Sequence, residues 1–301
     1  MTSNKAMFFG SGPVAARSLE KLLDYTEVEA VITKPRPAHH HGDVPVIDVA
    51  RRHSLPILTA SNRRELDSLI GEQDFTSDHA ILIDFGIIVS EKVINAFPLG
   101  IINSHFSLLP KLRGADPITW AIANGDTKTG VSLMLIDTGM DTGKLITQKS
   151  LTLDGSESSE ILTTKLIDLS DQLIKDYLPR YLSGDIVPRN QPHPDRATYS
   201  RKLTKDDGII DWQQPAAQIE RQIRAFSEWP KSHTKLGVSE VIITSAKLSD
   251  RKALTPGKIL VEKNCLFISA SDFYLEILTL KPSGKKNMPA NAFLAGYRDQ
   301  I

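Results

Sequence analysis

The first half of the chain alternates short apolar runs with stretches of helical periodicity, and this alternation constrains the fold more than any other feature. Strands alternating with helices predict an α/β fold, here a Rossmann-like, doubly wound and mainly parallel sheet with helices on its faces. Ligands of such sheets bind beyond the carboxyl ends of the strands. The predicted strands are Ala6–Gly10, Val28–Thr33, His79–Asp84, Gly100–His105 and Gly130–Asp137.

The pattern changes in the second half. A long helix is predicted at Glu160–Leu182, and the Pro-rich stretch Pro188–Pro194 is typical of a linker. One amphipathic helix, Pro215–Phe226, precedes a series of short strands that predicts a small β-barrel. We therefore expect an N-terminal domain over 1–186, a linker over 187–204 and a C-terminal domain over 205–301. The strands predicted for the barrel are Val241–Ser245, Gly257–Glu262, Leu266–Ala270 and Tyr274–Lys281.

Length and composition agree with two ordinary globular domains, since the chain has 301 residues, of which 41% are hydrophobic and 24% charged. Cys265 is the only cysteine, which excludes an internal disulfide and is typical of a reducing cytoplasm. The sequence has no apolar run of 18 residues and no signal-peptide pattern at its start. We therefore expect a cytoplasmic protein that does not span a membrane.

The net charge is zero, but the charges are unevenly distributed. Residues 201–301 contain 16 Lys or Arg against 11 Asp or Glu, a formal charge of +5, and the first 200 residues have the opposite balance. A basic region within a neutral chain is the asymmetry expected where one domain contacts phosphates.

Polar residues gather at the ends of two predicted strands. Asn103 and His105 lie two apart and therefore on the same side of a strand. Asp141 lies in a loop bracketed by Gly139 and Gly143, which follows the strand Gly130–Asp137. If the two strands are neighbours, these three side chains can converge on one pocket.

Acyl transfer to an amine needs three chemical groups. One accepts the proton of the amine, one donates a hydrogen bond to the oxyanion, and a carboxylate sets the charge of a histidine or relays protons. The Asn103, His105 and Asp141 set supplies one group for each, and an amine acceptor makes a Ser or Cys nucleophile unnecessary. On spacing alone, a strand-end cap and a turn residue account for the same pattern equally well.

A longer series of motifs resembles the folate-dependent formyltransferases. The resemblance implies that Asn103 and His105 polarise the formyl group and stabilise the oxyanion, that Asp141 assists proton transfer, and that no metal takes part. The motifs are, in chain order, Asn103-Ser104-His105, Ser107–Pro110, Arg113-Gly114, Gly125-Asp126, Thr129–Val131 and Asp141–Gly143.

The resemblance further implies 10-formyltetrahydrofolate as co-substrate. Packing in the core is an alternative role for Leu108 and Leu109. The same alternative holds for Ile87, Ile88 and Val89, which follow the predicted strand His79–Asp84. Arg113 either holds the loop or contacts an anionic substrate. The implied folate-binding residues are Ser107, Leu108, Leu109 and Pro110, with Phe85, Gly86, Ile87, Ile88 and Val89 against the pterin.

The C-terminal third is similar to the branch of this family that formylates methionine on initiator tRNA, through Tyr199–Leu203, Ile210–Trp212, Ile223–Phe226, Glu228–Pro230 and Pro282–Lys286. This similarity implies an OB-like barrel and initiator methionyl-tRNA as acceptor. We also expect a monomer, although the sequence itself leaves the oligomeric state open. A solvated basic face is the alternative for the cations expected to contact tRNA phosphates. Those cations are Lys34, Arg36, Arg221, Arg224, Lys285 and Lys286.

Two features depart from the pattern of that branch. The segment Lys34–Pro45 is short, with only two permanent cations, although His39-His40-His41 can add partial charge below neutral pH. Three adjacent histidines rarely converge on one metal ion, so a metal site is disfavoured there. Phe106 follows the catalytic histidine where a small residue or Pro is usual, and we expect it to narrow the entrance of the site.

Three rival functions remain. A formyltransferase acting on an amino-sugar nucleotide shares both domains, and the short segment at 34–45 favours it. A 10-formyl-folate hydrolase would not need the C-terminal domain. A nonenzymatic RNA-binding protein would not need Asn103, His105 and Asp141 together.

Overall fold

A computed structural model describes residues 5–36, 44–298 and 301. The chain forms two compact units that exchange segments. The first unit comprises Met1–Gly114, Thr129–Leu151 and Thr163–Tyr199, and the second comprises Ala115–Lys128, Thr152–Leu162 and Ser200–Ile301. The domain limits at 186 and 205 stay a prediction. Within the described residues, no helix is both long and apolar enough to cross a membrane.

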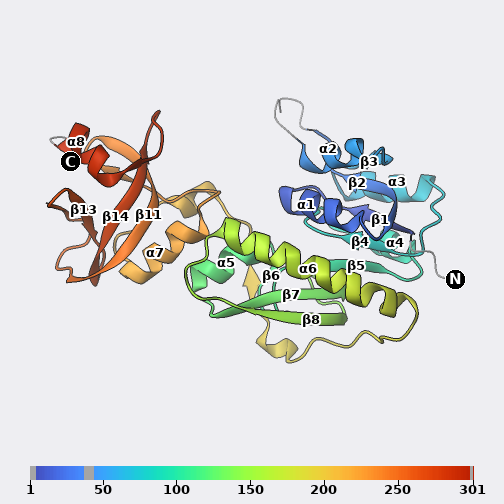
Figure 1. Cartoon of the computed structure of the whole chain (residues 1–301). Coiled ribbons are helices and arrows are strands. Elements are labelled where there is room, and N and C mark those ends of the chain that lie inside the picture. Colours follow the sequence, from blue (N-terminus) through green and yellow to red (C-terminus); the bar gives the residue numbers. More distant parts are fainter. Residues whose placement is uncertain (1–4, 37–43, 299–300) are drawn as a thin grey trace. The chain divides into compact units, whose positions relative to one another are not determined.

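The first unit is built on a seven-stranded sheet in the order β3-β2-β1-β4-β5-β7-β8 (Figure 1). Strands β1 to β5 pair in parallel and β7 pairs with β5 antiparallel, so the predicted mainly parallel sheet is confirmed. Two strands were not predicted, β3 and β8. The strands are β1 (Lys5–Phe9), β2 (Glu27–Thr33), β3 (Ile57–Thr59), β4 (Ala80–Leu82), β5 (Ile101–His105), β7 (Lys128–Leu135) and β8 (Leu145–Thr152).

Helices cover both faces of this sheet, as a doubly wound fold requires. Met7 and Phe9 of β1 pack in one core with residues of α3 and α4. Helices α1 and α6 lie side by side, joined by the ion pair between Lys21 and Asp168 at 3.1 Å. Ser104 of β5 is hydrogen-bonded to a serine of α6 at 2.6 Å, so α6 covers the other face. The helices are α1 (Pro13–Leu22), α2 (Pro45–Arg52), α3 (Arg63–Glu72), α4 (Glu91–Asn95) and α6 (Ser159–Leu182).

Local sequence sets where the helices of the first unit begin. Asn62 accepts a hydrogen bond from Glu65 N at 3.1 Å and caps the start of α3, and the Glu65 carboxylate accepts one from Ser61 N at 2.7 Å. Ser90 caps α4 through Val93 N at 3.2 Å. Helix α4 therefore begins directly after the loop that follows β4.

The second unit contains a six-stranded antiparallel sheet in the order β10-β11-β14-β13-β12, with β15 paired to β14. Its core joins apolar residues of this sheet with those of α7 and α8. All four strands predicted here are present, whereas β10 and α8 were not predicted. The elements of this unit are α5 (Pro117–Asn124), α7 (Ala216–Ala225), β10 (His233–Leu236), β11 (Ser239–Lys252), β12 (Ile259–Glu262), β13 (Cys265–Ser269), β14 (Phe273–Pro282), β15 (Met288–Pro289) and α8 (Ala290–Tyr297). Two further strands of two residues each, β6 (Arg113–Gly114) and β9 (Tyr199–Ser200), pair with one another.

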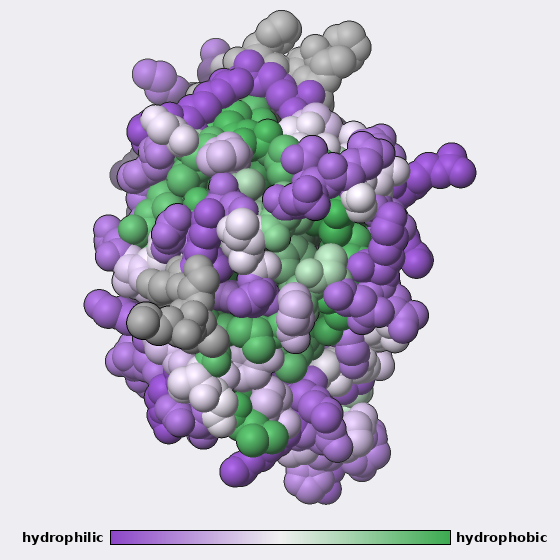
Figure 2. Space-filling view, turned by 90° about the vertical axis from the view of Figure 1, so that its right-hand side faces the viewer, coloured by the Kyte–Doolittle hydropathy of each residue, from purple (hydrophilic) through white to green (hydrophobic). Residues whose placement is uncertain are grey.

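The surface mixes polar and apolar side chains. Figure 2 shows one face on which hydrophilic side chains surround smaller groups of apolar ones. Such mixing is normal, because folded proteins have too little polar surface to cover themselves. Apolar exposure therefore does not by itself mark a binding site on this chain.

Burial of His79, directly before β4, should make the stability of the fold sensitive to acid. Its side chain is 1% exposed, and neither ring nitrogen has a partner among the described residues. Burial disfavours the imidazolium and lowers the pKa of His79 to about 4, while Asp78 opposes the shift. Below the unfolded-state pKa near 6.5, the unfolded chain binds a proton that the folded chain cannot bind. Stability is thus lost as the pH falls from about 6.5 towards 4.

We expect the free energy of unfolding to fall by about 2 kcal/mol between pH 7.5 and pH 5 through His79 alone. Urea unfolding at both pH values measures this loss. In a His79→Phe variant the pH dependence should be smaller by that amount, whereas His193→Asn, at an exposed position, should keep the wild-type dependence. Equal pH dependence in wild type and His79→Phe would contradict the assignment.

Candidate active site

Strand β5 holds Asn103 and His105 on one face. Ser104 between them points to α6, so both neighbours point to the opposite face, where α3 and α4 lie. Asn103 is 6% and His105 7% exposed. The predicted placement of both side chains on the same side of one strand is confirmed.

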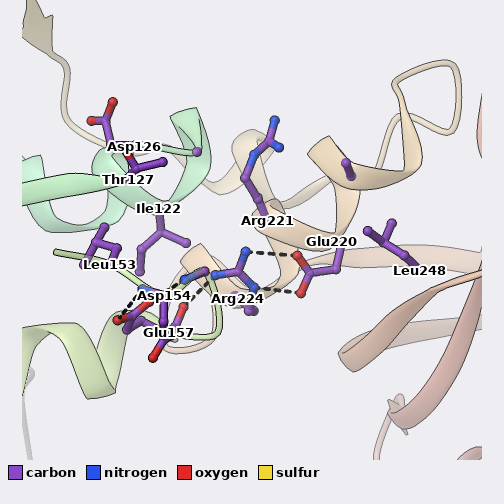
Figure 3. A pocket seen from close by; sticks show the side chains of 13 residues that line it. Ile122, Asp126, Thr127, Leu153, Asp154, Glu157, Glu220, Arg221, Arg224 and Leu248 are labelled. Carbon is purple, nitrogen blue, oxygen red and sulfur yellow. Dashed lines mark hydrogen bonds and ion pairs between the residues drawn. The ribbon is translucent and has the colours of Figure 1, made fainter.

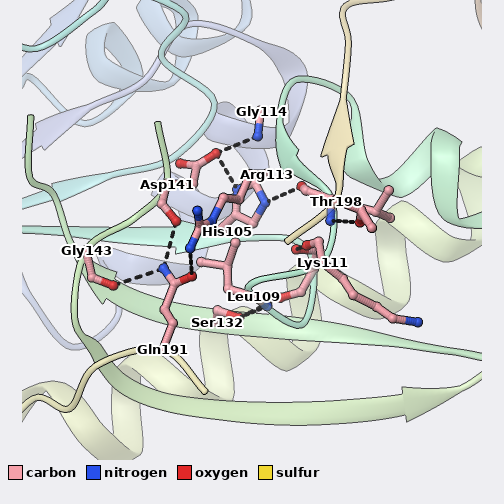
Figure 4. A network of polar contacts seen from close by, with 12 residues as sticks. His105, Leu109, Lys111, Arg113, Gly114, Ser132, Asp141, Gly143, Gln191 and Thr198 are labelled. Atoms are coloured by element: carbon pink, nitrogen blue, oxygen red, sulfur yellow. Dashed lines mark hydrogen bonds and ion pairs between the residues drawn. The ribbon is translucent and has the colours of Figure 1, made fainter. Parts of the chain in front are cut away.

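His105 has a defined ring orientation (Figure 4). Its Nε2 lies 2.9 Å from Leu112 O, and because a carbonyl oxygen only accepts, Nε2 carries the hydrogen and donates it. Its Nδ1 lies 3.7 Å from Asp141 Oδ2, too long for a direct hydrogen bond but close enough for one proton to pass through a water. Nδ1 is therefore the nitrogen that can exchange a proton in the site.

Asp141 is brought to His105 by the loop after β7, because β7 pairs with β5. Its backbone is left-handed, with φ of +51°. Gly114 N donates to Asp141 Oδ2 at 2.7 Å, whereas Asp141 Oδ1 receives no hydrogen bond from the described residues. A Cβ on Gly143 would lie 1.7 Å from Leu135 O, so only glycine allows the loop to turn back this closely. Adjacent strands thus bring Asp141 to His105, and Asn103 lies two residues before His105 on the same strand.

The Asn103 amide makes no hydrogen bond to the described residues. Buried side-chain amides normally have partners, so an unpartnered one on the same face of β5 as His105 is suited to bind a ligand oxygen. This is the position expected for an oxyanion donor.

Gln191 and Arg113 complete the surroundings of Asp141, and sequence reasoning missed Gln191. Its Nε2 donates to Asp141 O at 2.7 Å and to Gly143 O at 3.0 Å. Arg113 Nη2 donates to Gln191 Oε1 at 2.6 Å, and both side chains are 6% exposed. Of the two roles left open for Arg113, holding the loop fits this burial. A glutamine in a Pro-rich stretch has no pattern that would have identified it.

Two serine hydroxyls hold the loop predicted to bind folate by hydrogen bonds to main-chain atoms. Ser107 is buried, and its hydroxyl donates to Lys111 O at 2.5 Å. Ser132 of β7 donates to Ser107 O at 2.6 Å and accepts from Leu109 N at 3.1 Å. Leu109 packs in a core cluster with Met134. Leu109 thus has the core role weighed above, and the loop's folate contacts stay a prediction.

The second predicted folate segment follows β4. Phe85 is 2% exposed and packs edge-to-face on Phe9, with ring centroids 5.4 Å apart, so its side chain belongs to the core. Ile87 and Val89 pack partly against the same core, whereas Ile88 is 77% exposed. Gly86, with φ of +65°, lies beside the Lys34 ammonium, 2.9 Å from the position of a Cβ. Of this segment, Ile88 is the side chain most available to a ligand.

Phe106 is 6% exposed, and its role in narrowing the entrance stays a prediction. His39-His40-His41 lie outside the described residues. Within the described part of the chain, no three His, Cys, Asp or Glu residues are grouped to hold a metal ion.

Of the cations predicted to contact tRNA, Arg224 binds groups of the protein itself. It forms two hydrogen bonds to Glu220, at 2.7 and 3.0 Å, and donates to Glu157 O at 2.8 Å (Figure 3). Arg221 donates to Ala123 O at 3.3 Å, in a cavity of about 270 Å³ within the second unit. Lys285 and Lys286 are exposed after β14, as is Arg36 after β2.

A buried Asn–His pair on one strand of an α/β sheet, with an aspartate facing the histidine, fits an enzyme that transfers an acyl group to a nucleophilic acceptor. The chain belongs to the formyl transferase family. Residues 5–178 match the family model "Formyl transferase", and residues 202–298 match "Formyl transferase, C-terminal domain".

Individual relatives cover nearly the whole chain. It is 32% identical to a "Methionyl-tRNA formyltransferase" of Myxococcus xanthus, over 99% of this chain and 96% of the relative. It is 35% identical to the protein of that name from Trichlorobacter lovleyi, over 99% and 95%. Its fold resembles the crystal structure of an N-formyltransferase from Helicobacter canadensis in complex with folinic acid and dTDP-3-aminofucose, with a TM-score of 0.68, 20% identity and coverage of 91% and 98%.

Proposed function

We propose that this formyltransferase transfers the formyl group of 10-formyltetrahydrofolate to the amino group of methionine on initiator methionyl-tRNA. The observation that supports this most is the match over both domains to proteins named for that reaction. We further propose that the enzyme acts as a monomer in the cytoplasm.

The residues of the site account for each step of this transfer. The methionine nitrogen attacks the formyl carbon, and the carbonyl oxygen becomes an oxyanion. The Asn103 amide and a proton on His105 Nδ1 stabilise that oxyanion. Asp141 Oδ1, to which none of the described residues donates a hydrogen bond, accepts the amine proton directly or through water. The bond between the formyl carbon and the folate nitrogen then breaks, and that nitrogen takes up the proton as tetrahydrofolate leaves.

For folate binding we keep the predicted loops. Ser107, Leu108, Leu109 and Pro110 would line the folate site, and Ile88, which is 77% exposed, would contact the pterin. Folate derivatives are bound by the fold relative named above, which supports this class of co-substrate.

Lys285 and Lys286 are our candidates for tRNA phosphate contacts, because they are exposed in the basic C-terminal region. Replacing both with alanine should raise the KM for tRNA about five- to tenfold and reduce its dependence on salt, with kcat and the folate KM unchanged. Steady-state kinetics at several salt concentrations measure this. The matched control replaces Lys92 and Lys165, two exposed lysines of α4 and α6. An equal rise in the KM for tRNA after replacement of either lysine pair would contradict a specific role of Lys285 and Lys286 in tRNA binding.

An amino-sugar nucleotide is the second candidate acceptor. The short segment at 34–45 and the fold relative with dTDP-3-aminofucose favour it. The test is to incubate the enzyme with 10-formyltetrahydrofolate and each acceptor, beside a reaction without acceptor, and to identify products by mass spectrometry. Formylmethionyl-tRNA supports the proposal. Formylated sugar alone would replace it, and formate without an acceptor would indicate hydrolysis.

A further inference from the structure

We infer that Gln191 is a positioning residue for the transfer, acting through Asp141; this rests on the role that the proposed function gives Asp141. Gln191 contributes nothing to the reacting atoms. Its amide fixes the backbone on which the Asp141 carboxylate depends.

The contacts of Gln191 use its whole amide group. Both N–H hydrogens are donated to the loop, to Asp141 O at 2.7 Å and Gly143 O at 3.0 Å. Its oxygen accepts from the Arg113 guanidinium at 2.6 Å. The side chain is 6% exposed, so water cannot easily replace these bonds.

The three segments joined in this way are far apart in the sequence (Figure 4). Residue 191 comes from the stretch predicted to be a linker, Arg113 from β6, and Asp141 from the loop after β7. Gly114, next to Arg113, donates to Asp141 Oδ2 at 2.7 Å. Gln191 thus ties the backbone of Asp141 to the strand that binds its carboxylate.

Asp141 needs such support because of its conformation. A non-glycine residue with φ of +51° adopts a sparsely populated conformation that surrounding contacts must maintain. Its carboxylate is also not in hydrogen-bond contact with His105, since the gap is 3.7 Å. A shift of about 1 Å in a catalytic group can cost about 100-fold in rate. The hydrogen bonds of Gln191 to both sides of residue 142 oppose such a shift.

Only an amide side chain at residue 191 can make all three hydrogen bonds that hold the Asp141 loop. Gln191→Leu keeps most of the volume but loses all three bonds. Gln191→Glu keeps the acceptor for Arg113 but cannot donate to the two carbonyls. If the residue served only to neutralise Arg113, Glu would preserve activity. If it positions the loop, both variants should lower kcat, by about 10- to 100-fold, with the KM for each substrate within about twofold of wild type.

The decisive measurement is a double-mutant cycle with Asp141→Asn. Because Gln191 acts through Asp141, Gln191→Leu should lower kcat less than twofold further once Asp141 is replaced. Multiplicative losses would overturn the inference, as would activity restored by Glu or a loss confined to KM. Gln172→Leu, on α6 with its side chain bonded to Lys149, is the matched control and should keep wild-type kcat.

Amide hydrogen exchange of a peptide covering 137–143 tests the inference without any acceptor. Exchange should be faster in Gln191→Leu and unchanged in Gln172→Leu, each at a temperature where circular dichroism shows a folded protein. Unchanged exchange in Gln191→Leu would overturn the inference. Absence of transfer by wild type to methionyl-tRNA would count against the proposed function alone, since the exchange result does not depend on it.

Discussion

His105→Ala is expected to lower kcat for formyl transfer by about 1,000-fold, with the KM for both substrates changed less than about threefold. The substitution removes the ring whose Nδ1 faces the site and Asp141, while Nε2 serves only to hold the ring on Leu112 O. Removing one oxyanion donor typically costs 100- to 1,000-fold, and loss of a proton-transfer group adds to this. Single-turnover kinetics with saturating co-substrate measure the chemical step directly.

The control for this variant is His53→Ala. His53 lies on the surface after α2 and is paired with Glu20 at 3.2 Å, so its loss should leave kcat unchanged. Retention of more than a tenth of wild-type kcat by His105→Ala, with a similar melting temperature, would contradict the assigned role.

Asp141→Asn should lower kcat by about 100-fold. Asparagine can still accept the hydrogen bond from Gly114 N and tolerates the left-handed conformation, so the loop should keep its fold. It cannot accept the proton that Asp141 Oδ1 takes from the amine. The loss should therefore appear in kcat, and raising the pH, which deprotonates the free amine, should recover part of it.

Asp137→Asn is the matched control within the same loop. Asp137 accepts from Gly139 N at 3.0 Å and from the Thr142 hydroxyl at 2.7 Å, and it has no contact with His105. Its replacement should reduce kcat less than about fivefold. Equal losses from the two variants would mean that loop structure, and not the carboxylate at residue 141, limits the rate.

Much of the fold could be predicted because it depends on local patterns. The runs that became β1 and β2 are apolar over most of their length, as expected of strands buried on both faces. Strand β8 was missed because Lys149 and Ser150 break its apolar pattern at the exposed edge of the sheet. Helix α8 was missed because Ala, Asn and Gly in Ala290–Tyr297 give weak helical periodicity, and packing of Phe293 into the core stabilises it.

The catalytic side chains could be predicted because they lie at strand ends within recognisable motifs. The residues that hold them could not, since their partners are main-chain atoms distant in sequence. Gln191 contacts loop carbonyls 50 and 48 residues away. Phe85 looked like a ligand contact next to Gly86, yet tertiary packing on Phe9 buries it. Arg224 looked like a phosphate contact, yet Glu220 one helical turn earlier binds it.

The most direct test of the proposed function compares kcat/KM for initiator methionyl-tRNA with that for dTDP-3-aminofucose, using one enzyme preparation and 10-formyltetrahydrofolate. We predict a value for the tRNA at least 1,000-fold higher, because the basic C-terminal region offers phosphate contacts that a sugar nucleotide cannot fill. A higher value for the sugar nucleotide would contradict the proposed acceptor and leave the formyl-transfer chemistry of Asn103, His105 and Asp141 in place.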